Sequence, residues 1–147
     1  MNTSDRKLGD GDVAILSDIE GMVCLIVDDE PLCLEQFEQL ITDLGGMTLK
    51  ANNGAEAVAT FAENHLLIDL VIMDIMMPVL DGVSAAERIF AIDEETNLLF
   101  CSGAISSERG LYLEKKYQAG FIRKPLDEQA IKRTILNRLS KGVVTRR

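Results

Sequence analysis

The sequence has 147 residues and contains no long hydrophobic run. Acidic residues such as Asp69 and Asp74 interrupt its most apolar region, so no segment offers the roughly 20 apolar residues that a membrane-spanning helix needs. Residues 1–12 lack the apolar centre of a signal peptide. We therefore expect no association with a membrane and a cytoplasmic location.

Cysteine is scarce and irregularly placed. The three cysteines are Cys24, Cys33 and Cys101, with no CxxC pair among them. An odd, scattered set is typical of buried thiols in a reducing compartment and disfavours a disulfide framework or a structural zinc site. Nucleotide binding is also disfavoured, because the sequence contains neither GxGxxG nor GxxxxGK[ST].

Basic residues are outnumbered. Lys and Arg total 15 against 24 Asp and Glu, and the net charge of −9 disfavours direct binding of nucleic acid. The charge is uneven, since residues 1–123 carry 8 basic and 22 acidic residues, whereas residues 124–147 carry 7 and 2. The sequence therefore predicts an acidic body with a basic C-terminal end.

The remaining composition, with 47% hydrophobic and 27% charged residues, is that of an ordinary globular domain. We expect one domain over residues 22–139. Residues 1–21 are mostly polar and predict an N-terminal extension or linker, with a short apolar stretch at 13–16 through which it could dock. Residues 140–147 predict a basic C-terminal tail.

Short apolar runs alternate with amphipathic segments along the domain. The runs predict strands over 22–27, 47–51, 70–73, 98–101 and 121–122. The segments between and after them predict helices over 31–44, from 53, over 81–92, 106–118 and 126–139. Five βα units are too few for an eight-stranded barrel, so the fold class is α/β, with an open, doubly wound (βα)5 sheet of five parallel strands. The polar run at 47–51 indicates a strand near an edge.

Polar residues follow four of these strands. They are Asp28 and Asp29 after the first strand, Asp74 after the third, Ser102 after the fourth and Lys124 after the fifth. Ligands bind at the carboxyl ends of the strands in such sheets, so these side chains should converge. Packed carboxylates repel one another unless a cation lies among them, and Mg²⁺ prefers oxygen ligands. Lys124 and Ser102 suit phosphoryl oxygens, so the site is predicted to form a carboxylate–phosphate adduct with Mg²⁺.

Each feature also has an ordinary structural explanation. An Asp-Asp pair often caps a helix, a Ser after a strand often forms a turn, and Lys-Pro is common in turns. Their occurrence together at one edge of the sheet favours a functional site.

The motifs in this order resemble the response-regulator receiver domain of two-component signalling, in particular chemotaxis regulators. The motifs are Val27-Asp28-Asp29-Glu30, Val71-Ile72-Met73-Asp74-Ile75-Met76-Met77-Pro78 with Asp81-Gly82, Cys101-Ser102-Gly103 and Lys124-Pro125. The resemblance extends over about residues 21–139. It implies a flavodoxin-like strand order, 2-1-3-4-5.

The resemblance also implies roles for individual residues. Asp74 would accept a phosphoryl group from a sensor histidine kinase, a phosphotransfer protein or a small phosphodonor. Mg²⁺, the one cofactor implied, would be held by Asp28, Asp29, Asp74 and the backbone carbonyl of Met76. Lys124 would pair with the phosphoryl group, and the Lys124–Pro125 peptide would be cis. Such a domain is not an enzyme beyond catalysing its own phosphorylation and slow dephosphorylation.

Receivers carry a two-state switch, and the corresponding residues here are Ser102 and Phe121. The resemblance implies that they alter a surface formed by residues 106–118, 121–122 and 126–139, which would bind a downstream protein target or a second copy on phosphorylation. Plain core packing explains Phe121 equally well. Met76 and Ala104 cannot hydrogen-bond an attacking water through their side chains, which predicts slow loss of the phosphoryl group.

Two other functions remain as alternatives. A haloacid-dehalogenase-type phosphatase also uses an Asp at a strand end, but carries a second Asp two residues later as general acid, where this sequence has Met76. A pseudo-receiver would bind partners without taking phosphate, although such domains usually lose an acid or the lysine, and both are kept here. The sequence leaves open whether the chain acts alone or is the receiver piece of a longer protein.

Overall fold

The computed structural model describes residues 20–141, which contain five strands and five helices. The strands are β1 (Val23–Val27), β2 (Met47–Ala51), β3 (Leu70–Asp74), β4 (Leu98–Ser102) and β5 (Gly120–Arg123). The helices are α2 (Pro31–Asp43), α3 (Gly54–Asn64), α4 (Gly82–Ile92), α5 (Ser107–Tyr117) and α6 (Glu128–Lys141). Strands and helices alternate strictly, as the sequence predicts.

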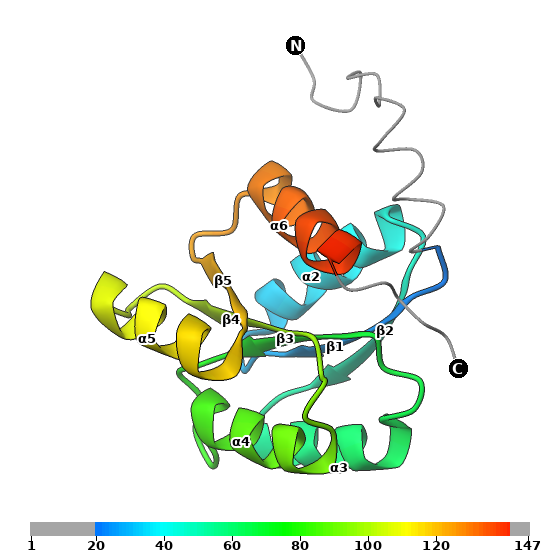
Figure 1. The fold of residues 1–147 in the computed structure, drawn as a ribbon. Coiled ribbons are helices and arrows are strands. Elements are labelled where there is room, and N and C mark those ends of the chain that lie inside the picture. Colours follow the sequence, from blue (N-terminus) through cyan, green and yellow to red (C-terminus); the bar gives the residue numbers. More distant parts are fainter. Residues whose placement is uncertain (1–19, 142–147) are drawn as a thin grey trace.

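All strand pairs are parallel, and the order across the sheet is β2-β1-β3-β4-β5. This confirms both the doubly wound class and the flavodoxin-like order. Figure 1 shows α2 and α6 covering one face of the sheet, while α3, α4 and α5 lie on the other side. The carboxyl ends of all five strands consequently meet at one edge, which is where a ligand site is expected.

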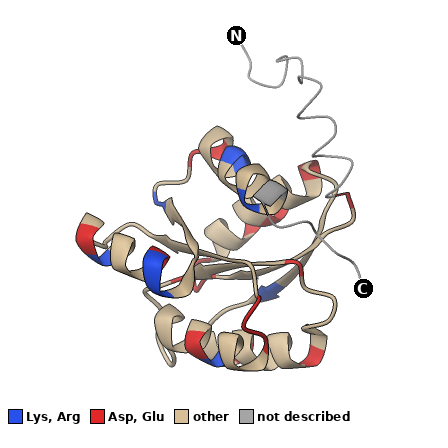
Figure 2. Ribbon diagram, viewed as in Figure 1, with Lys and Arg blue, Asp and Glu red and all other residues tan. Residues whose placement is uncertain are grey.

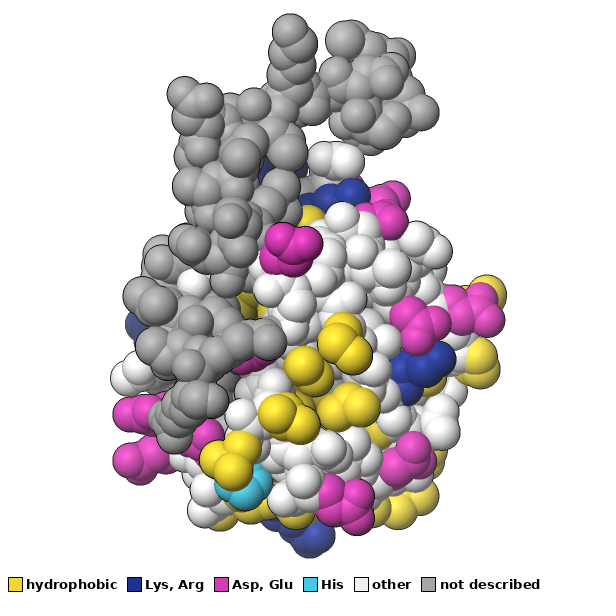
Figure 3. Space-filling view, turned by 90° about the vertical axis from the view of Figure 1, so that its right-hand side faces the viewer, with side chains coloured by type: hydrophobic (Ala, Val, Ile, Leu, Met, Phe, Trp, Pro, Cys, Tyr) yellow, Lys and Arg dark blue, Asp and Glu magenta, His cyan; other side chains and the backbone are white. Residues whose placement is uncertain are grey.

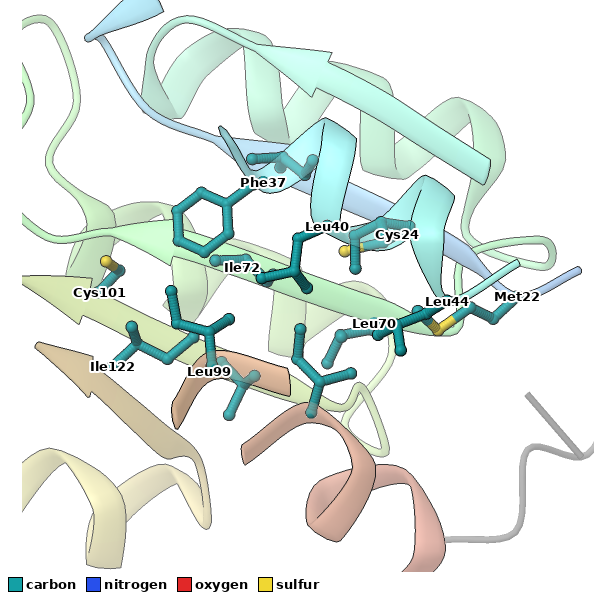
Figure 4. Close-up of a cluster of buried hydrophobic side chains, with 14 of the residues drawn as sticks. Met22, Cys24, Phe37, Leu40, Leu44, Leu70, Ile72, Leu99, Cys101 and Ile122 are labelled. Atoms are coloured by element: carbon teal, nitrogen blue, oxygen red, sulfur yellow. The ribbon is translucent and has the colours of Figure 1, made fainter. Parts of the chain in front are cut away.

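The hydrophobic core has two parts, one on each face of the sheet. One joins the sheet to α2 and α6 through residues such as Phe37 and Ile135 (Figure 4). The other joins the sheet to α3, α4 and α5 through residues such as Phe61, Ile89 and Leu113. Strands β3 and β4 are buried along their whole length, because a parallel sheet covered by helices on both faces hides both sides of its central strands.

Strand β2 lies at an edge of the sheet, as its polar sequence predicts. Its first residue, Met47, is 65% exposed, and Leu66 and Leu67, after α3, are exposed as well. Figure 3 shows hydrophobic side chains gathered on the face of the molecule seen from this side, near the single histidine. The edge of the sheet is therefore less polar at its surface than the strand sequence suggests.

The element boundaries differ from the predictions by one or two residues. The last helix begins at Glu128 and not at Leu126, because Asp127 caps it, with Oδ1 accepting hydrogen bonds from the backbone N–H groups of Gln129 and Ala130. It ends at Lys141, so the predicted boundary after residue 139 falls inside the helix. Residues 1–19 of the predicted extension and 142–147 of the predicted tail lie outside the described residues.

The distribution of charge follows the sequence in part. Figure 2 shows Lys and Arg on α5 and α6, with acidic residues spread over the other elements and the loops. Within residues 20–141, no helix combines the length and the apolar character that crossing a bilayer requires.

Candidate functional site

The predicted strand-end residues come together at the carboxyl edge of the sheet. Asp28 directly follows β1 and Asp74 ends β3, which pairs with β1. Carboxylate oxygens of Asp28, Asp29 and Asp74 all lie within 4.8 Å of one another. The parallel register brings them together because the neighbouring strands end at the same level.

Two adjacent acids have opposite environments. Asp28 is 1% exposed, whereas Asp29 is exposed to solvent. Oδ1 of Asp28 accepts a hydrogen bond from the backbone N–H of Glu30 at 2.9 Å. Oδ2 of Asp28 is buried without a hydrogen-bond partner of normal geometry among residues 20–141, and its contact with the ammonium of Lys124 at 2.9 Å is an ion pair. A buried carboxylate oxygen in this state favours a cation beside it.

The carboxyl group of Asp74 is only 3% exposed. Burial, and then the negative charges of Asp28 and Asp29, raise the pKa of Asp74 to about 6, although Lys124 and the backbone N–H of Met76 act in the opposite direction. The carboxylate form of Asp74 is therefore destabilised until positive charge is added to the site.

Lys124 supplies one positive charge to this edge. Its Nζ lies 2.9 Å from Asp28, 3.3 Å from Glu30 and 3.7 Å from Asp74. Partial burial alone would lower the pKa of Lys124, but the carboxylates of Asp28 and Asp74 outweigh it and raise this pKa above its ordinary value. The Lys124–Pro125 peptide is cis, as the resemblance implies.

Ser102 ends β4 and is buried, with Oγ accepting a hydrogen bond from the backbone N–H of Ala104 at 3.3 Å. Phe121 lies on β5, partly buried against the core on the α3–α4–α5 side. Its ring faces the guanidinium group of Arg123 at 5.6 Å. The structure thus places Ser102 at the site edge and Phe121 on the adjacent strand, and both roles in switching stay predictions.

The loop between β3 and α4 is held tightly against the acceptor residue. The backbone N–H of Gly82 donates to the carbonyl of Ile75 at 2.9 Å, and a Cβ at Gly82 would lie only 2.0 Å from the carbonyl oxygen of Asp74. Only glycine fits such a close approach. Asp81 caps α4 by accepting a hydrogen bond from the backbone N–H of Ser84 at 2.9 Å. These contacts explain the Asp81-Gly82 pair.

An open cavity of about 450 Å³ lies beside this loop. Its lining includes Met76, which is 64% exposed, and Ala104 from the loop after β4. Both residues thus border a space that solvent can enter next to Asp74, in agreement with their predicted place along the path of an attacking water.

Sequence reasoning missed two residues at this edge, Glu30 and Cys33. Glu30 binds the ammonium of Lys124, and Sγ of Cys33 lies 3.8 Å from Oε2 of Glu30. Glu30 is the third acid in a row after β1, and Cys33 follows it by three residues at the start of a helix. Because residues three apart on a helix share a face, this spacing could have placed both beside the site.

The three aspartates fit a hard divalent cation. They offer only oxygen ligands, which Mg²⁺ prefers, and they include a buried carboxylate oxygen that lacks a hydrogen bond. The second group of potential ligands in residues 20–141, which consists of Asp28, Glu30 and Cys33, contains a sulfur atom that Mg²⁺ does not favour. The oxygen-only group is therefore the candidate magnesium site.

Residues 24–136 match the family model described as the response regulator receiver domain. The chemotaxis protein CheY of Thermotoga maritima is 33% identical over 122 residues, which cover 82% of this chain and 99% of that protein. LuxN of Vibrio harveyi, an autoinducer 1 sensor kinase/phosphatase, is 36% identical over 121 residues, and the match spans 82% of this chain but only 14% of LuxN.

Solved structures show the same similarity. CheY from the CheX–CheY–BeF3–Mg²⁺ complex of Borrelia burgdorferi superposes with a TM-score of 0.76 at 28% sequence identity. The superposition covers 80% of this chain and 89% of that one.

Proposed function

This chain belongs to the response regulator receiver family of two-component signalling, and on that basis we propose that Asp74 is its phosphoacceptor. The observation that carries the proposal is the buried carboxyl group of Asp74 at a strand end, beside the carboxylate of Asp28 and the ammonium of Lys124. A sensor histidine kinase or phosphotransfer protein is the proposed donor, and a small phosphodonor can replace it.

The proposed reaction transfers a phosphoryl group to a carboxylate oxygen of Asp74. A bond forms between this oxygen and phosphorus, and the bond from phosphorus to the donor breaks, with its electron pair leaving on the donor. Such transfers depend mainly on positioning and on electrostatic stabilisation of the phosphoryl oxygens. Asp74 must be ionised to attack, so its raised pKa makes added positive charge a requirement.

Mg²⁺ would supply this charge when bound. The residues proposed to hold it are Asp28, Asp29, Asp74 and the backbone carbonyl of Met76. Lys124 is proposed to pair with a phosphoryl oxygen, because its ammonium already lies at this edge. Ser102 is proposed to donate a hydrogen bond to another oxygen, since its hydroxyl lies at the end of the neighbouring strand.

The proposed output is a change in the surface formed by α5, β5 and α6, coupled to Ser102 and Phe121. Leu111 and Tyr112 of α5 are 52% and 56% exposed, which gives this surface apolar contact area for a downstream protein or a second copy. No partner is identified by these features. A cytoplasmic location also stays a prediction.

The relatives support the proposal through what they bind or contain. The CheY of Borrelia burgdorferi forms a complex with CheX, BeF3 and Mg²⁺, which agrees with an acidic magnesium site and a surface for a protein partner. LuxN is a sensor kinase/phosphatase, and this chain resembles 14% of it, so a place in a phosphotransfer chain is consistent with both the stand-alone and the longer-protein alternatives.

The alternatives are weaker on specific grounds. A pseudo-receiver has no need for the intact set of Asp28, Asp74 and Lys124, whose contacts are all present. A haloacid-dehalogenase-type phosphatase would need a general acid where the exposed, uncharged Met76 lies. Because receivers are signalling domains, we propose no catalytic activity on an external substrate.

The experiment is phosphorylation by acetyl phosphate with Mg²⁺, followed by intact mass spectrometry. We expect the mass of one added phosphoryl group, lost in Asp74→Asn and in EDTA. Asp81→Asn is the matched control, since Asp81 is an exposed carboxylate in the next loop, and it should keep the adduct. An unmodified wild-type protein with every donor would instead favour the pseudo-receiver.

A further inference from the structure

A second cluster of potential ligands lies next to the three aspartates. Ligand atoms of Asp28, Glu30 and Cys33 all lie within 4.8 Å of one another. The three residues come from one short segment that ends β1 and starts α2. Asp28 belongs to both clusters, but Glu30 and Cys33 have no part in the proposed phosphoacceptor site.

The backbone fixes the positions of these residues. The N–H of Glu30 donates to Oδ1 of Asp28 at 2.9 Å, and the N–H of Cys33 donates to the carbonyl of Glu30 at 3.1 Å. These bonds form the first turn of α2 and bring Sγ of Cys33 to 3.8 Å from Oε2 of Glu30. The sulfur is buried, while Glu30 is largely exposed and leaves the cluster open to solvent on one side.

An independent feature points to a cation at this place. Oδ2 of Asp28 is fully buried and lacks a hydrogen bond of normal geometry among the described residues. The ammonium of Lys124 lies 2.9 Å from this oxygen and 3.3 Å from Oε1 of Glu30. Positive charge is therefore already favoured between these two carboxylates.

We infer that Asp28, Glu30 and Cys33 form a second cation site, which binds Zn²⁺ in preference to Mg²⁺. Zinc accepts mixed sulfur and carboxylate ligands in a tetrahedral arrangement, with water able to fill the fourth position. Magnesium requires oxygen ligands in octahedral geometry and does not favour a thiolate. The sulfur atom thus separates the two clusters chemically, although they share one carboxylate.

Zinc at this site excludes two features of the neighbouring one. It takes over Oδ2 of Asp28, and its charge displaces the ammonium of Lys124 from the space between Asp28 and Glu30. The thiol of Cys33 gives its proton to solvent on binding. If Asp74 accepts phosphate as proposed above, zinc therefore inhibits that reaction, and this consequence alone rests on the proposed function.

The binding test uses Co²⁺ as a spectroscopic substitute for zinc, with no phosphodonor present. A Co²⁺–thiolate bond gives a near-ultraviolet charge-transfer band, which the wild-type chain should show and which excess Zn²⁺ should abolish. Cys33→Ser should lose the band, and its affinity for zinc should fall at least about tenfold. Cys24→Ala and Asp29→Asn should keep the band, because Cys24 lies elsewhere and Asp29 belongs only to the oxygen cluster.

Three results would overturn the inference: a wild-type chain without the band, a Cys33→Ser variant that keeps it, or equal zinc affinity in the two. The inhibition test then adds Zn²⁺ to the acetyl phosphate reaction at saturating Mg²⁺. Wild type should be inhibited at a zinc concentration at least about tenfold below that needed for Cys33→Ser. If no phosphorylation occurs at all, the proposed function fails while the cobalt band still decides the site.

Discussion

Nζ of Lys124 lies 3.7 Å from Oδ2 of Asp74, beyond hydrogen-bonding distance. The ammonium is held instead by Asp28 at 2.9 Å. The carboxylate proposed to attack phosphorus is therefore free of a direct bond to the lysine. A phosphoryl group on Asp74 would bring new oxygen atoms toward Lys124, so the lysine is positioned to serve the product more than the unmodified site.

The first prediction concerns the cost of an ionised Asp74. Its folded-state pKa of about 6 lies above the ordinary value of 3.8, so between these values the folded chain binds more protons than the unfolded chain. Stability then falls as pH rises through this window. Without divalent cations at pH 7.5, Asp74→Asn should raise the free energy of unfolding by about 1 to 3 kcal/mol.

Urea unfolding at several pH values measures this effect. The gain from Asp74→Asn should shrink below pH 6 and vanish below about 3.8. Asp81→Asn is the control, because hydrogen bonds from Ser84 lower the pKa of Asp81 and reverse the sign. A gain in Asp74→Asn that is independent of pH would show that ionisation is not its cause.

The second prediction concerns magnesium. Binding to the folded chain alone should stabilise it by about 1.4 kcal/mol at ten times the dissociation constant. Asp28→Asn and Asp74→Asn should lose most of this gain in thermal unfolding, because each removes a charged ligand. Glu30→Gln should respond to Mg²⁺ like wild type, since Glu30 lies outside the oxygen-only cluster. Equal responses in all four proteins would contradict the assigned ligands.

The third prediction concerns Lys124. Its charge lowers the pKa of Asp74, so Lys124→Met should move that pKa above about 6. Carbon-13 NMR titration of labelled aspartate carboxyl groups measures the change. Phosphorylation by acetyl phosphate should also slow at least about tenfold, since charge stabilisation at a reaction centre is worth this much or more. Lys50→Met removes a surface lysine bound to Glu38 and should change neither quantity.

The fourth prediction concerns the lifetime of the phosphorylated state. Met76 is exposed beside Asp74 and offers no hydrogen bond to an attacking water. Met76→Gln should shorten the lifetime severalfold, because an amide can orient that water. Met47→Gln makes the same change at an exposed methionine on β2 and should leave the lifetime unaltered. A wild-type phosphoryl group lost within seconds would sink the prediction of slow hydrolysis.

Several parts of this molecule were predictable from local patterns. The apolar runs that became β3 and β4, the capping by Asp81 and the edge position of β2 all depend on short-range sequence features. The start of α6 was predicted two residues too early, since the apolar Leu126 resembles a helical residue and the competing cap at Asp127 was overlooked.

The sequence by itself determined the βα alternation and the set of polar residues at the strand ends, because hydrophobic periodicity and turn residues act over a few positions. Only the tertiary structure decided how these residues share charge. Asp28 and Asp29 are neighbours in sequence, yet one is buried and the other exposed. Lys124 binds Asp28 and Glu30 across more than 90 residues, a pairing set by the packing of β5 and α2 on the same sheet edge. Burial and long-range contact fix charge, pKa and ligand geometry, and no local pattern encodes them.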